Sequence, residues 1–179
     1  QIDPARVIYE TAIRPGEEPT AALTLVGARI AVADGAREEA ARTLASLSQG
    51  DTPTSLAALE ALVPLAIELK VALPDWLITD LRAAAFQQRG SDREADLRAL
   101  LVAALAAQNA LPTAIAESRS AIADLPSDAP RFEALAVRSL AATDPQTVGA
   151  STYARTAIEA ADLIGTAAPR DPDRRVIAD

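Results

Sequence analysis

The stretch from Asp96 to Pro126 constrains the fold most, because it joins two apolar segments across one central break. Residues 99–107 contain no polar side chain. On both sides of the break at residues 108–110, apolar residues recur every three or four positions, the spacing of one face of an α-helix. Pro126 ends the second segment, since proline cannot continue a helix. The stretch therefore predicts a helical hairpin that needs neighbours to cover its apolar surface.

The amino-acid composition favours an all-α fold. Half of the 179 residues are apolar and only 3% are aromatic. Alanine is abundant and has the highest helix propensity, whereas the residues that favour strands are thinly scattered. The apolar fraction is sufficient for a real core, in one compact domain or one short repeat array.

The charge and the missing residue types exclude several function classes. The formal net charge is −8, and Lys70 is the only lysine. Binding to nucleic acid requires clustered cations, so we expect no nucleic-acid partner. No apolar run approaches the roughly 20 residues that cross a bilayer, so we expect no direct membrane insertion by this segment. The chain has no histidine and no cysteine, which leaves only carboxylate or hydroxyl chemistry. We therefore expect that the chain is not an enzyme and that it binds neither a metal nor a cofactor.

Helix-capping and helix-breaking residues divide the chain into nine predicted helices. Pro64 should kink or break the fourth, and Ser91 or Asp92 should cap the sixth. Glu94 and Arg98, four positions apart, should form an ion pair. The predicted helices span residues 3–13, 20–33, 37–48, 54–71, 73–90, 92–108, 110–125, 130–142 and 146–164.

The breaks between these helices recur at a constant distance. Those inside the proposed hairpins are about 37 residues apart and fall at Gly35, near Ala72, at Asn109 and at Pro145. Those between hairpins, near Thr52, Gly90 and Ser127, have the same spacing. A constant spacing is typical of repeats that stack because no unit covers its own apolar face. It predicts an α-α superhelix of about four antiparallel helix pairs.

Three segments follow from this interpretation. Residues 1–19 form a helix and a loop, which can be the end of a truncated repeat. Residues 20–164 form the helical-hairpin repeat domain. Residues 165–179 form a polar, proline-containing tail that we expect to be mobile unless something docks it.

Two of the predicted turns resemble a known repeat family. The residues Asp34-Gly35-Ala36-Arg37-Glu38-Glu39-Ala40, followed by Leu44 and Leu47, resemble the turn and second helix of a tetratricopeptide repeat. In the central hairpin Asn109 replaces the turn glycine, and Ala114, Ala121 and Pro126 fall where that family has two alanines and a closing proline. The chain departs from the family at its aromatic positions, occupied by Ala31, Leu105 and Ala141, and its period is a few residues longer.

The resemblance implies binding instead of catalysis. In that family the first helix of each pair lines a concave groove that receives a peptide or a helix. The corresponding residues here are mostly apolar, and the Lys and Asn pattern that grips a peptide carboxylate is missing. The predicted partner contacts are Leu25, Arg29, Leu62, Ala66, Ala103, Phe132 and Ser139.

The sequence therefore predicts a tetratricopeptide-like protein-interaction or scaffolding module of a larger bacterial protein, with a groove for an apolar or amphipathic protein or peptide segment. Alternatively, the array closes on itself, over the tail for example. The chain can also be an accessory or regulatory domain of an enzyme or envelope protein whose active part lies elsewhere. A small-molecule carrier is less favoured, because alanine-lined interfaces close up. The lack of cysteine and the start at Gln1 lean slightly towards export.

Two further features allow two interpretations each. Trp76 can be an exposed anchor, but a single tryptophan beside Leu73 and Leu77 is more often packed. The carboxylate pairs at residues 17–18 and 38–39 can be catalytic acids, but adjacent side chains on a helix point in different directions and such pairs are usually solvated.

Overall fold

The computed structural model describes residues 4–13, 16–50 and 52–167, and within them the chain is helical with no strand. This confirms the predicted all-α class. The helices are α1 (Pro4–Ala12), α2 (Ala21–Ala33), α3 (Arg37–Leu47), α4 (Pro53–Glu68), α5 (Asp75–Gln87), α6 (Glu94–Ala107), α7 (Leu111–Asp124), α8 (Ala129–Ala142), α9 (Pro145–Val148) and α10 (Ala150–Ala167), with one 3-10 turn, η1 (Pro126–Asp128), before α8.

The predicted tail begins later than expected, because residues 165–167 still belong to α10. Its remainder, residues 168–179, lies outside the described residues. The chain divides into two compact units, Gln1–Ser91 and Asp92–Asp179. The division falls inside the segment predicted as one repeat domain.

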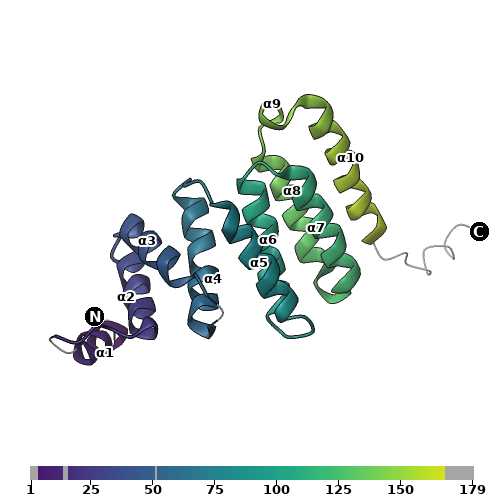
Figure 1. Ribbon diagram of the computed structural model, residues 1–179. Helices are drawn as coiled ribbons and strands as arrows, with labels where there is room; N and C mark the ends of the chain where they lie inside the picture. The colour runs from purple at the N-terminus through teal and green to yellow at the C-terminus, as the bar shows by residue number, and fades with distance from the viewer. Residues whose placement is uncertain (1–3, 14–15, 51, 168–179) are drawn as a thin grey trace, which may run out of the picture. The chain divides into compact units, whose positions relative to one another are not determined.

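In the first unit, each helix from α1 to α4 packs on the next one along the chain (Figure 1). Helix α2 also contacts α4, so the first helices of two successive pairs lie together. Side-chain ion pairs link Arg6 to Asp34 and Arg37 to Glu68. Helix α5 differs from the others, since it packs only lightly on α4 and is not among the helices packed on α3.

In the second unit, α6 packs on α7 and on α8, and α10 packs on both α7 and α8 (Figure 1). Its core joins α7, α8 and α10 through the buried cluster Leu111, Ile115, Ala136, Ala160 and Leu163. In this unit, α8 and α10 cover the apolar face of α7.

Three helices end in the same hydrogen-bonded turn, with a residue of positive φ just after the helix. The residues are Gly35 (φ 88°), Lys70 (φ 53°) and Asn109 (φ 58°). After α6, the amide of Ala110 donates to the carbonyl of Leu105 and that of Asn109 to Ala106. The same two bonds follow α2 and α4. This is the Schellman motif, which occupies carbonyls left open at a helix end. The expected turn near Ala72 is thus centred on Lys70.

Replacing Lys70 by glycine should raise the free energy of unfolding by roughly 1 kcal/mol, because a side chain in the left-handed region costs about that much and glycine does not. Urea unfolding followed by circular dichroism measures the change. Gly35→Ala is the matched opposite and should lower the free energy. If both substitutions changed the free energy of unfolding by the same amount and in the same direction, the left-handed turn conformation would not be strained.

Two local predictions are wrong and a third is wrong in part. Of the kink or break predicted at Pro64, the break is absent: α4 runs continuously through Pro64, whose ring is exposed, because packing of its buried residues outweighs one lost backbone bond. Neither Ser91 nor Asp92 caps α6. The residue before α6 is Arg93, which makes no capping bond, while the hydroxyl of Ser91 donates to the carbonyl of Gln88 at 2.6 Å. The last predicted helix is split at Gly149, whose φ of 83° separates α9 from α10.

Candidate binding groove

The described residues hold no group of three or more acidic, histidine or cysteine side chains that could bind a metal. None of the helices described is long and apolar enough to cross a membrane. The carboxylate pairs at residues 17–18 and 38–39 are exposed, and neither pair belongs to a group of three or more such side chains. The feature best suited to binding is an apolar groove in the first unit.

The groove lies between α3, α4 and the segment that leads into α5, and it encloses about 290 Å³. One wall is the face of α3 formed by Glu38, Ala41, Arg42 and Ala45. The opposite wall is formed by Leu62, Ala66 and Leu69 of α4 and its end. Each wall spans seven residue steps, from 38 to 45 and from 62 to 69, which is about 10.5 Å at the helical rise of 1.5 Å per residue. We call this feature the α3–α4 groove.

The segment between α4 and α5 closes one side of the α3–α4 groove. It contributes Val71, Ala72, Leu73 and Pro74, followed by Trp76 and Leu77 of α5. Trp76 is half-buried. It is therefore neither the exposed anchor nor the fully packed side chain that the sequence allowed. Because it is the only tryptophan of the chain, its fluorescence reports on the groove alone.

The groove is open because α5 does not complete the second helix pair. In the hairpins α2–α3 and α6–α7 the next helix starts two residues after the turn residue of positive φ, whereas α5 starts five residues after Lys70. Pro74 is the residue before α5, and proline favours an extended backbone just before it. Helix α5 therefore leaves the face of α3 uncovered.

The charges around the groove lie on α3. Glu38 and Arg42 are exposed, one helical turn apart. The guanidinium Nε of Arg42 donates to the backbone carbonyl of Glu38 at 3.4 Å. A ligand in the groove therefore meets apolar side chains below and one charge of each sign at the edge.

The structure brings together only two of the residues predicted to contact a partner, Leu62 and Ala66, which share a wall of the groove. On α2, Leu25 is buried and Arg29 is exposed, and neither lines the groove. Ala103 of α6 is half-buried. The predicted contacts on α8 are Phe132 and Ser139, and both are buried.

The sequence prediction missed the contribution of α3 and of residues 71–77. It considered only the first helix of each pair, whereas the groove lies between the second helix of one pair and the first helix of the next. The only sequence signal for this wall is weak: two small residues one turn apart, Ala41 and Ala45, which both line the groove.

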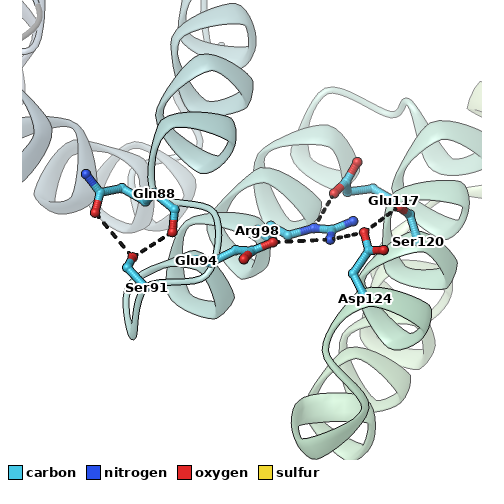
Figure 2. Close-up of polar contacts among 7 residues, drawn as sticks. All are labelled: Gln88, Ser91, Glu94, Arg98, Glu117, Ser120 and Asp124. Atoms are coloured by element: carbon cyan, nitrogen blue, oxygen red, sulfur yellow. Dashed lines mark hydrogen bonds and ion pairs between the residues drawn. The ribbon is translucent and has the colours of Figure 1, made fainter.

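A separate group of charges lies in the second unit around Arg98, which is 7% exposed. Its guanidinium donates to Glu117 at 2.9 Å and to Asp124 at 2.8 Å, and a third carboxylate, Glu94, lies 3.7 Å away (Figure 2). The predicted pair of Glu94 and Arg98 is confirmed. It is part of a network that ties α6 to α7.

Arg98 remains charged throughout the pH range in which proteins fold. Burial alone would lower the pKa of its guanidinium, but the hydrogen bonds to Asp124 and Glu117, together with their charges, outweigh burial and raise that pKa above its ordinary value. A raised pKa contributes stability that is lost only as the pH rises through the folded value, which here is beyond any physiological range. The charged guanidinium therefore connects α6 to α7 across the physiological pH range.

Comparisons with known proteins do not name a family: no protein-family model, no curated protein and no solved structure matches the chain.

Proposed function

We propose that this chain is a non-catalytic protein-interaction module of tetratricopeptide-like construction, and that its α3–α4 groove receives an apolar or amphipathic segment of another protein. The observation that carries the proposal is the open apolar space of about 290 Å³ beside Ala41 and Ala45. A cavity of about 150 Å³ lined by aliphatic side chains holds one benzene-sized group. The groove therefore has room for two such groups.

The chemistry of the chain supports binding in preference to catalysis. It supplies neither an imidazole nor a thiol, and the groove walls carry no acidic pair facing one another. Apolar walls with a few charges at the edge are typical of surfaces that bind a peptide segment.

Replacing Ala45 by phenylalanine should fill the groove and weaken peptide binding by roughly tenfold or more, which corresponds to about 1.4 kcal/mol. The test is a selection of displayed random peptides on the intact chain, followed by affinity measurements of the enriched peptides. We expect the wild type to enrich peptides with clustered apolar residues.

The matched control is Ser46→Phe, because Ser46 is exposed on the same helix and does not line the groove. It should leave the affinities unchanged, and circular dichroism should show both variants folded. The proposal fails if no peptide is enriched, or if the enriched peptides bind the Ala45→Phe and wild-type chains equally well.

A further inference from the structure

The two units repeat one arrangement with a register of 74 residues. Gly35 and Asn109, both of positive φ, are 74 residues apart. The burial pattern has the same register, as shown by three pairs of buried residues: Ala28 and Val102, Ala40 and Ala114, and Leu62 and Ala136. Helix α3 therefore corresponds to α7, and α4 to α8. In chain order, α5 corresponds to α10.

In the second unit, α10 fills the space between α7 and α8. Ile115 of α7 and Ala136 of α8 belong to the same buried cluster as Ala160 and Leu163 of α10, and Leu140 packs against it. Thr156 of α10 is buried as well. The filling helix thus presents its residues at positions i, i+4 and i+7, the spacing of one helical face.

In the first unit, the corresponding space is the α3–α4 groove. Ala41 and Ala66 lie 74 residues before Ile115 and Leu140, and Leu62 lies 74 residues before Ala136. All three line the groove. The first unit has the smaller side chain at two of these positions, with Ala41 in place of Ile115 and Ala66 in place of Leu140, and the larger one at Leu62. Helix α5 does not take the place of α10.

Helix α5 is not available to fill this space. Its apolar face, Leu77, Ile78, Leu81 and Ala85, is already buried. The segment from Val71 to Pro74 forms one side of the groove. Closure by α5 would displace this segment.

We infer that the α3–α4 groove is an empty helix position, completed by an amphipathic α-helix of another protein that presents apolar residues at i, i+4 and i+7. This inference rests on the proposed function and narrows its ligand from a segment to a helix. The partner helix carries a bulkier anchor than α10 does, because Ala41 leaves volume that Ile115 fills in the second unit. The position lies between successive pairs, and not on the concave surface of the first helices.

The charges at the groove edge complement a partner helix that runs parallel to α3. In the second unit, α7 and α10 run in the same direction (Figure 1), and Arg119 of α7 lies 3.9 Å from Glu159 of α10. A helix parallel to α3 that carries a basic residue and, four positions later, an acidic residue pairs with both Glu38 and Arg42. Helix α10 has this order in Arg155 and Glu159. By the 74-residue register, Arg119 corresponds to Ala45, so Glu159 of an α10 peptide would lie about one helical turn from Arg42.

The test uses a peptide with the α10 sequence Ala150–Ala167, constrained to be helical by a side-chain bridge and carrying Ala160→Leu. This A160L peptide contains no tryptophan, so Trp76 of the intact chain reports binding. We expect a saturable change in Trp76 fluorescence and weaker binding, by roughly tenfold, for the constrained peptide of native sequence. In the Ala41→Ile chain the order of the two affinities should invert, because the isoleucine occupies the space that the added leucine side chain of the A160L peptide would fill.

A charge exchange provides a second test with a variant at an exposed position. Arg42→Glu should lower the affinity of the chain for the A160L peptide severalfold. A peptide with both Ala160→Leu and Glu159→Arg should bind the Arg42→Glu chain with the affinity restored. An unbridged peptide that combines Ala160→Leu with Ala157→Pro keeps the anchors but cannot form the helix.

The outcomes separate the two proposals. If the proline peptide binds as tightly as the helical one, or if the volume and charge exchanges have no effect, the inference of a helix is overturned while groove binding stands. The helical peptides could also fail to bind while peptides from the selection bind and lose affinity in the Ala45→Phe chain. That outcome likewise overturns the inference of a helix and leaves groove binding in place. A groove closed by α5 would bind no peptide of either kind, and that result overturns both proposals.

Discussion

Replacing Phe132 by alanine should lower the free energy of unfolding by about 3–5 kcal/mol, the range for removing a fully buried aromatic side chain. Phe132 has an exposed fraction of 0% and is the largest fully buried side chain among the described residues. It lies on α8, which packs on α6, α7 and α10. Urea unfolding followed by far-ultraviolet circular dichroism measures the loss.

Val137→Ala is the matched control on the same helix. Val137 is 46% exposed, so its truncation should change the free energy of unfolding by no more than about 0.5 kcal/mol. The same comparison tests whether Phe132, which the sequence analysis predicted to contact a partner, is a core residue instead. A loss for Phe132→Ala as small as the loss for Val137→Ala would contradict its place in the core.

Replacing Arg98 by methionine should destabilise the chain by about 3 kcal/mol, because three carboxylates then remain near one another without their cation. Methionine preserves most of the apolar stem, so the effect reports on the charge. The value is at the low end of the range for breaking a buried ion pair, since Glu117 and Asp124 are 22% and 36% exposed and keep some contact with water.

Arg131→Met is the control for this prediction. Arg131 pairs with Asp96 at 2.7 Å, but both side chains are exposed, and exposed ion pairs contribute about 0–1 kcal/mol. The loss for Arg98→Met should therefore exceed the loss for Arg131→Met severalfold. It should also persist in high salt, which screens exposed pairs more than buried ones. Similar losses for the two variants would show that the network around Arg98 is solvated.

Most of the fold was predictable because local signals and the hydrophobic pattern agree. The helix predicted over residues 20–33 agrees with α2, and it ends before Gly35 as expected. The break expected at Pro64 is absent because packing, which a local rule does not include, holds α4 together. The division of the last predicted helix depended on one glycine, Gly149, whose positive φ only the tertiary structure reveals.

The candidate groove was predictable only in part. Leu62 and Ala66 were identified from the family resemblance, which assigns binding to the first helix of each pair. The wall from α3 was missed because Ala41 and Ala45 are ordinary helix residues in the sequence. They line a groove only because α5 does not cover them, and the position of α5 depends on how the residues after Lys70 direct the chain.

Amide chemical-shift mapping of the intact chain, titrated with the A160L peptide, tests most directly whether the α3–α4 groove is an empty helix position. We predict that the largest shifts occur in the walls of the groove, at Ala41, Ala45, Leu62, Ala66 and Trp76, and that they are lost in the Ala45→Phe chain. Shifts centred on the exposed face of α2 around Arg29, or equally large shifts in the Ala45→Phe chain, would contradict the account.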